Sequence, residues 1–169
     1  MLISVPLGPG CSVDEAMPPP DCLTGGAAIH AAQSVPSAQL VPCFETIPAG
    51  WEVDSVTIDQ DGTVVRFDSD RAGVDAAIFH YHASCDRRGA LSEPSEIRGA
   101  NRYDLIESVA PNFRATRFYE FDGGCMWWEF DFDTGATAAL SIELGATLSV
   151  VSRDELNDSI REFFIDEDL

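Results

Sequence analysis

The sequence contains no lysine, so arginine supplies all ten of its basic side chains, against 29 acidic ones. The formal net charge is -19 at pH 7. A chain this negative repels the phosphates of nucleic acids and the surface of anionic membranes, which argues against both as direct partners. Two interpretations of the charge stay open: solubility in a salty or exposed setting, or a field that attracts cations or a basic partner.

The sequence also lacks a run of about 20 apolar residues, the length that a membrane-spanning helix needs. It has no Gly-x-Ser-x-Gly, no phosphate-binding glycine-rich loop, no His-Glu-x-x-His and no dinucleotide fingerprint. We therefore predict no catalytic residues and no cofactor, and we favour a protein that is not an enzyme.

Cysteine is present five times, but no two cysteines are close enough to form Cys-x-x-Cys. This spacing disfavours a zinc ribbon or a thioredoxin-type motif. Widely spaced cysteines in an acidic chain favour disulfides made in an oxidising compartment. We predict the pairs Cys22–Cys43 and Cys85–Cys125 and assign no role to Cys11. Reduced cysteines in a cytoplasmic protein are the alternative.

The strongest pattern in the chain is an internal similarity. Residues 56–82 match residues 119–145 without a gap at a shift of 63 positions, so that Asp59, Phe67, Asp68 and Asp70 meet identical residue types. Each copy contains alternating β-branched or aromatic residues around an Asp/Gly turn, which is typical of a β-hairpin. The similarity therefore predicts two repeated hairpin units.

The fold class that follows is α+β. We expect one antiparallel sheet built from the two hairpin units, with a further strand at 75–83 and helices packed on one face. Residues 1–26 are rich in proline and glycine and are predicted to form a linker or an extended arm. Residues 27–169 are predicted to form a single domain, beginning with a short helix at 27–35.

Two more helices are expected, at 103–110 and 153–164. The first has helical spacing through Leu105, Ile106 and Val109. The second begins with a capping box, in which Ser152 and Glu155 cover free backbone N–H groups. Residues 136–151 fit both a strand and a helix. Every even position is apolar, so we favour a strand at 137–144.

Two pairs of side chains are candidates for a divalent metal. His80 and His82 point to the same side of a strand, so both imidazoles could bind one ion. Asp68 and Asp70 lie at a strand end, where paired carboxylates attract Ca²⁺ or Mg²⁺. Solvent-facing histidines and ordinary turn aspartates are the alternatives for these residues.

Two other pairs are candidates for an interaction surface. Arg87 and Arg88 belong to a basic group in a long polar loop, which would bind either a partner's carboxylates or the domain's own acidic residues. Trp127 and Trp128 are adjacent on a strand and must face opposite ways, so one is expected in the core. The other would be covered by a helix or exposed as a contact platform.

The chain resembles uncharacterised extracytoplasmic domains of actinobacterial membrane and exported proteins. The resemblance spans roughly residues 43–160 and is carried by Pro48-Ala-Gly-Trp51, Asp68-Ser-Asp-Arg-Ala-Gly73, Cys85-Asp86, Gly89-Ala90, Arg102-Tyr103, Gly123-Gly-Cys125 and Arg153-Asp-Glu-Leu156. It implies a location outside the cytoplasm and an upstream membrane anchor, and it favours helix over strand in 136–151. It implies no activity.

These observations favour a non-enzymatic binding or interaction module of the cell envelope. Its expected partner is an envelope protein, such as a membrane protein complex. The alternatives are a metal-dependent envelope enzyme that uses His80, His82 and nearby carboxylates, and a carrier with a small-ligand pocket between sheet and helices.

Overall fold

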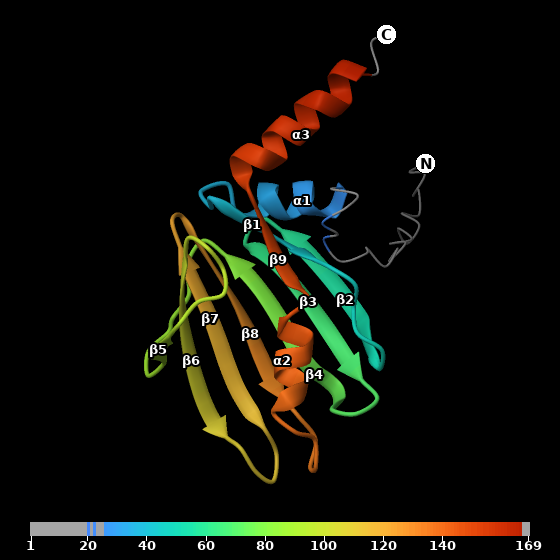
Figure 1. Cartoon of the computed structure of the whole chain (residues 1–169), viewed down its shortest axis with the longest axis vertical. Coiled ribbons are helices and arrows are strands. Elements are labelled where there is room, and N and C mark those ends of the chain that lie inside the picture. Colours follow the sequence, from blue (N-terminus) through green and yellow to red (C-terminus); the bar gives the residue numbers. More distant parts are fainter. Residues whose placement is uncertain (1–19, 21, 23–25, 167–169) are drawn as a thin grey trace, which may run out of the picture.

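The structure is a computed structural model that describes residue 20, residue 22 and residues 26–166. The predicted linker at 1–26 and Cys11 therefore lie almost entirely outside the described residues. Figure 1 shows the elements in chain order: α1 (Gly26–Ser34), β1 (Leu40–Phe44), β2 (Trp51–Asp59), β3 (Gly62–Ser69), β4 (Gly73–His82), β5 (Leu91–Glu93), β6 (Ala100–Ser108), β7 (Arg114–Phe121), β8 (Gly124–Asp131), α2 (Ala139–Gly145), β9 (Leu148–Ser152) and α3 (Arg153–Asp166).

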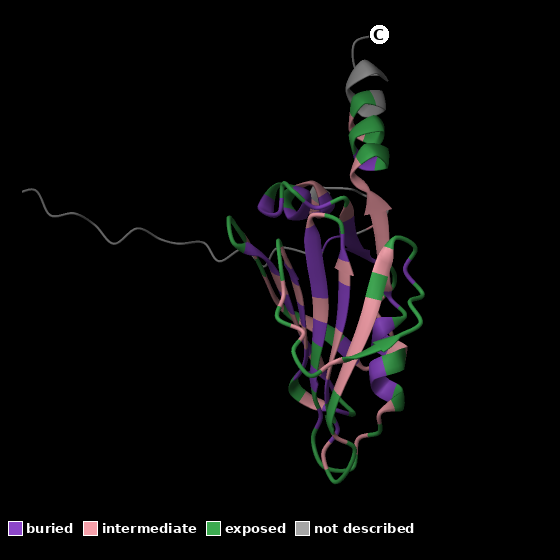
Figure 2. Cartoon of the chain, turned by 90° about the vertical axis from the view of Figure 1, so that its left-hand side faces the viewer, coloured by how far each residue is buried: buried purple, intermediate pink, exposed green. Residues whose placement is uncertain are grey.

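Seven antiparallel strands form the main sheet, in the order β2-β3-β4-β8-β7-β6-β5. Alternate side chains of the central strands point to one face, which we call the inner face. The largest of them are fully buried, and Figure 2 shows burial concentrated in these strands. They are Val65, Phe67, Phe79, Tyr81, Met126 and Trp128. The opposite, outer face carries His80, His82 and Trp127.

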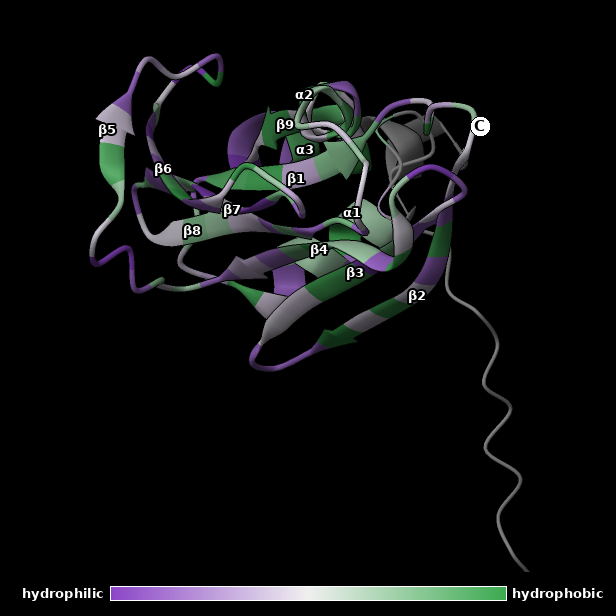
Figure 3. Ribbon diagram, turned by 90° about the horizontal axis from the view of Figure 1, so that it is seen from below, coloured by the Kyte–Doolittle hydropathy of each residue, from purple (hydrophilic) through white to green (hydrophobic). Residues whose placement is uncertain are grey.

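A second layer covers part of the inner face. It consists of the two-stranded sheet β1-β9 together with α2, as the view from below shows (Figure 3). Phe44 of β1 enters the core between the layers, with its ring centroid 5.1 Å from that of Phe79 and 5.8 Å from that of Trp128. Helix α1 packs on β1, β2 and β3. The helix of this layer, α2, is only seven residues long.

The predicted α+β class is wrong, because the described part of the chain is β-rich, with nine strands against three helices. Residues 103–110 lie largely in β6, which ends at Ser108, and both Ile106 in the strand and Val109 just after it are exposed. Pairing with β7 along the whole strand outweighs the local helical spacing. Helix α3 begins at its capping box, in which Glu155 N–H donates to Ser152 Oγ. Leu156 in its first turn packs on the core, and the helix then extends away from both layers instead of lying along a sheet face (Figures 1 and 2).

Residues 137–144, predicted as a strand, lie mainly in α2. Leu140 and Leu144 are buried one helical turn apart, while Ile142 on the other side of the helix is exposed. Burial at a spacing of four residues therefore outweighs the alternating pattern. The strand β9 follows at Leu148 and pairs with β1. Among the described residues, no helix is long and apolar enough to span a membrane.

The internal similarity corresponds to a real relationship between β3 and β8. Both strands pair with β4, and Thr63 and Met126 lie opposite the same residue, Tyr81. The shift of 63 positions is thus the register of the sheet. The two hairpins do not superpose, however, because β2 lies outside β3 on one side and β7 lies outside β8 on the other. The third predicted strand also has no second copy, since α2 takes its place.

Candidate functional site

The predicted histidine pair lies on the outer face, next to Trp127. The ring of His80 stacks on the indole of Trp127 with centroids 4.5 Å apart, and the His82 ring lies 5.1 Å from the same indole. Nε2 of His80 and Nε2 of His82 are both buried without a hydrogen-bond partner. Burial, only partly offset by the charge of Glu129, lowers the pKa of His80 and keeps the ring neutral.

The structure keeps the two predicted pairs of metal ligands apart, although the His80 and His82 rings lie 6.0 Å from one another. Asp68 lies four residues along β3 from Val64, the pairing partner of His80, which places it about 13 Å away along the strand. The Asp68 carboxylate accepts the backbone N–H of Asp75 instead, at 2.7 Å. Asp70 lies beside Arg71, at 3.5 Å. In the described part of the chain, no group of three or more His, Cys, Asp or Glu side chains could hold a metal ion.

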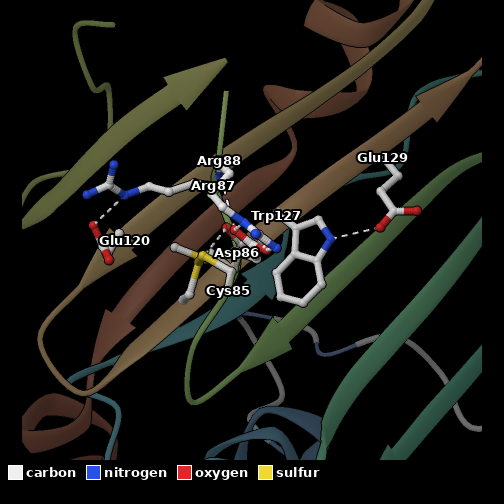
Figure 4. Close-up of a disulfide and its surroundings, with 9 residues drawn as sticks. Cys85, Asp86, Arg87, Arg88, Glu120, Trp127 and Glu129 are labelled. Carbon is white, nitrogen blue, oxygen red and sulfur yellow. Dashed lines mark hydrogen bonds and ion pairs between the residues drawn. A yellow bond between two sulfur atoms is a disulfide. The ribbon is translucent and has the colours of Figure 1, made fainter. Parts of the chain in front are cut away.

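The two tryptophans face opposite ways, as the alternation requires. Trp128 is fully buried in the core, so it cannot serve as a contact platform. Trp127 is half-buried on the outer face, where its Nε1 donates to Glu129 Oε1 at 2.9 Å (Figure 4). Since His80 already covers one side of its indole, Trp127 offers little open surface.

Both predicted disulfide pairs are present: Cys22 with Cys43, and Cys85 with Cys125. They indicate an oxidising, extracytoplasmic environment. Figure 4 shows the second bond fastening the loop after β4 to the first residues of β8.

In this loop, Arg87 donates to Glu120 at 3.0 Å and its guanidinium lies 4.0 Å above the Tyr103 ring. Arg88 pairs with Asp86. Both arginines thus contact the domain's own acidic side chains.

A wide cleft lies elsewhere, on the inner face. The β1-β9 layer and α2 cover β4 and β8 but leave β6 and β7 partly open, and a cleft of about 700 Å³ remains there. It is lined by Pro94, Ser95, Glu96, Ile97, Arg102, Arg117, Tyr119, Ile142, Gly145, Ala146 and Leu148. Its volume falls in the range typical of small-molecule sites.

A network of ion pairs forms one side of the cleft. Arg102 donates to both oxygens of Asp104, at 3.0 and 2.6 Å, and to Glu96 at 3.1 Å. The hydroxyl of Tyr119 donates to the other oxygen of Glu96 at 2.6 Å. The hydrogen bond to Asp104 raises the pKa of Arg102, and burial together with Glu96 raises that of Tyr119. These groups therefore remain protonated donors at neutral pH.

Arg117 lies in the middle of the cleft and is the residue that the predictions missed. Its side chain is 14% exposed, and its Nε is buried without a hydrogen bond. The closest carboxylate oxygen, on Asp104, is 3.4 Å from Nε. A signal was present in the sequence: Arg117 is in phase with Ala115, Tyr119 and Phe121, the inward-facing residues of β7.

Neither a protein-family model, nor a curated protein, nor a solved structure matches the chain. Function must therefore be inferred from the chemistry of the described residues. The cleft presents permanently charged donors beside an apolar wall formed by Ile97, Ile142 and Leu148. Such an arrangement is suited to holding a ligand in one orientation, since arginine does not exchange its proton at physiological pH.

Proposed function

We propose that this protein is a non-enzymatic, extracytoplasmic binding module of the cell envelope, and that the cleft between β6–β7 and α2 is its binding site. The observation that carries the proposal is the cleft that α2 and Leu148 of β9 form with β6 and β7. This cleft has a volume of about 700 Å³ and combines apolar side chains with converging polar groups. This combination is the usual composition of a ligand site.

The surroundings of the cleft support this choice over the outer face. Ile142 is 65% exposed and faces no other part of the described chain closely enough to be buried. On the outer face, by contrast, the conspicuous side chains already contact one another, as His80 and Trp127 do. The two disulfides favour a location outside the cytoplasm, and the acidic surface favours partners other than nucleic acid or anionic lipid.

A fragment screen by NMR tests the proposal. Uniformly ¹⁵N-labelled protein is mixed with a library of small soluble compounds, and shifts of backbone amides are mapped onto the structure. We expect binders to shift the amides of Ile97, Gly145 and Ala146. The substitution Ala146→Trp fills the cleft from an exposed position and should abolish these shifts.

The matched control is Ala83→Trp, which introduces the same side chain at an exposed position just after β4. It should leave binding unchanged. Fragments that shift no cleft amides, or that bind Ala146→Trp as tightly as the wild type, would overturn the assignment of the cleft as the binding site.

A further inference from the structure

We propose that the cleft is a carboxylate-binding site anchored by Arg117, and that its ligand is a small monocarboxylate with an apolar body. This inference rests on the proposed function, because it names the ligand class of the same cleft. It adds a requirement that the proposed function does not make: the ligand must carry a negative oxygen pair that meets the Arg117 guanidinium.

The first step is that Arg117 has no hydrogen-bond partner within the described residues. Most other arginines do: Arg66, Arg71, Arg87, Arg88, Arg102, Arg114, Arg153 and Arg161 donate to carboxylates or backbone carbonyls. Arg98 is the remaining arginine, and it is exposed, so water satisfies it. Arg117 is thus the one arginine in this part of the chain whose Nε is buried without a hydrogen bond, although Asp104 pairs with it at 3.4 Å.

The second step is that the neighbouring Asp104 carboxylate cannot supply the hydrogen bond that Arg117 lacks. Both carboxylate oxygens of Asp104 already accept hydrogen bonds from Arg102. Asp104 contributes charge to Arg117 at 3.4 Å but no aligned hydrogen bond. A buried N–H donor without an acceptor is costly, and a carboxylate that meets a guanidinium with two parallel hydrogen bonds gives it a stronger partner than a charge alone does.

The third step is the space around the guanidinium. Gly145 in α2 leaves room for it, since a Cβ built at Gly145 would lie only 3.1 Å from Arg117 Nη1. Arg117 also lines a separate, smaller crevice of about 40 Å³, beside Phe113 and Phe130. The open space therefore lies on the side of Ile97, Ile142 and Leu148, where an apolar ligand body would cover Ile142.

The charge of the whole chain limits the ligand further. A net charge of -19 repels polyanions, and the cleft itself balances Arg102 and Arg117 against Asp104 and Glu96. A single negative charge is the most that this environment accommodates, which points to a monocarboxylate rather than a phosphate or a dicarboxylate.

The test compares two probes that differ only in the acidic group: 4-phenylbutyrate and 4-phenylbutanamide. Dissociation constants are measured by NMR titration on the full chain, together with the chemical shift of the Arg117 side-chain Nε–H. We expect the acid to bind at least about tenfold more tightly than the amide, the factor that one charged hydrogen bond supplies. We also expect the acid alone to shift the Arg117 resonance.

Two variants and one control show whether Arg117 causes the preference for the acid. Arg117→Gln should reduce the preference for the acid to within about twofold, whereas Arg98→Gln, the matched exposed position, should keep it. Gly145→Ala displaces the guanidinium without removing it and should weaken the acid more than the amide. Circular dichroism melts establish that each variant is folded, and Gly145→Ala decides the matter if Arg117→Gln does not fold.

The outcomes separate this inference from the proposed function. If both probes bind the cleft equally and Arg117→Gln changes nothing, the cleft is a binding site but the carboxylate assignment is wrong. If neither probe nor any screened fragment binds, both are wrong. A peptide ending in Leu-Phe with a free carboxyl group provides a further arm. If it binds more than tenfold tighter than 4-phenylbutyrate, the small-molecule assignment is overturned in favour of a chain terminus.

Discussion

The imidazole of His80 lies flat on the indole of Trp127, with ring centroids 4.5 Å apart and an angle of 6° between the planes. The two residues are direct partners in the pairing of β4 with β8, so the register of the sheet produces the stack. Around it lie His82, Glu129 and Arg66, the other titratable or charged groups that act on His80. Burial in this stack is what keeps the imidazole neutral.

The first prediction is a loss of stability in mild acid that depends on His80. Burial lowers the pKa of His80 in the folded chain, whereas the unfolded chain titrates at about 6.5. Below that pH the unfolded state binds a proton that the folded state does not, so the free energy of unfolding falls as the pH falls. His80→Phe keeps a ring on Trp127 and should flatten this dependence.

Urea denaturation at intervals between about pH 7.5 and pH 5 measures the effect. His30→Gln serves as the control, because His30 is exposed on α1. An equally steep pH dependence in His80→Phe and the wild type would show that His80 is not the responsible group.

The second prediction concerns the turn between β7 and β8. Gly123 has a φ of 73°, and a Cβ there would lie 1.8 Å from the backbone oxygen of Ser37. Gly135 also has a positive φ, 97°, but nothing lies within 4 Å of its Cβ position. Gly135→Ala should therefore cost about 1 kcal/mol through backbone strain alone, and Gly123→Ala more than about 3 kcal/mol. Equal losses in thermal or urea melts would contradict this account.

The hairpins and the capping box of α3 could be predicted because each depends on residues close in sequence or on a strict alternation. The turn at Asp122 and Gly123 and the cap at Ser152 and Glu155 are local features of this kind. Residues 103–110 and 137–144 could not be assigned correctly in the same way. Each fits two periodicities, and only pairing with β7 or packing against the core decides between them.

The candidate site was missed for a related reason. The cleft exists because the β1-β9 layer and α2 cover β6 and β7 only in part, and that is a property of topology rather than of any motif. Arg102 and Arg117 are 15 positions apart in the chain and meet only through the β6–β7 register, in which Arg117 lies opposite Asp104. The sequence patterns point instead to His80 and Arg87, whose side chains already stack on Trp127 and donate to Glu120 respectively.

The third prediction concerns the end of α1, which Arg153 caps from a distant part of the chain. Its guanidinium donates to the carbonyl oxygens of Ala32, Val35 and Ala38 at 2.7–3.0 Å. A cation at this position satisfies free carbonyls and opposes the negative end of the helix dipole. Arg153→Ala should lower the free energy of unfolding by about 2 kcal/mol.

Arg161→Ala is the matched control, because Arg161 lies on α3, as Arg153 does, and its ion pair with Asp158 is exposed. It should cost less than about 0.5 kcal/mol. Hydrogen exchange adds a local readout: Arg153→Ala should speed exchange at the α1 amides. Unchanged exchange there, with or without a loss of stability, would mean that Arg153 does not cap α1.

The last prediction concerns the Cys85–Cys125 bond, which closes a loop of 40 residues from β4 to β8. By the loop-entropy relationship, removing it through Cys85→Ala and Cys125→Ala should destabilise the protein by about 4 kcal/mol. The Cys22–Cys43 bond closes 21 residues, so its removal should cost about 3 kcal/mol. Urea melts of the two double variants give both values.

Since domain stability is commonly about 5–15 kcal/mol, reduction of both bonds in the wild type should leave it largely unfolded at 37 °C. A reduced protein as stable as the oxidised one would contradict both the structural role of the bonds and the inferred oxidising environment, because the fold would then not depend on either disulfide.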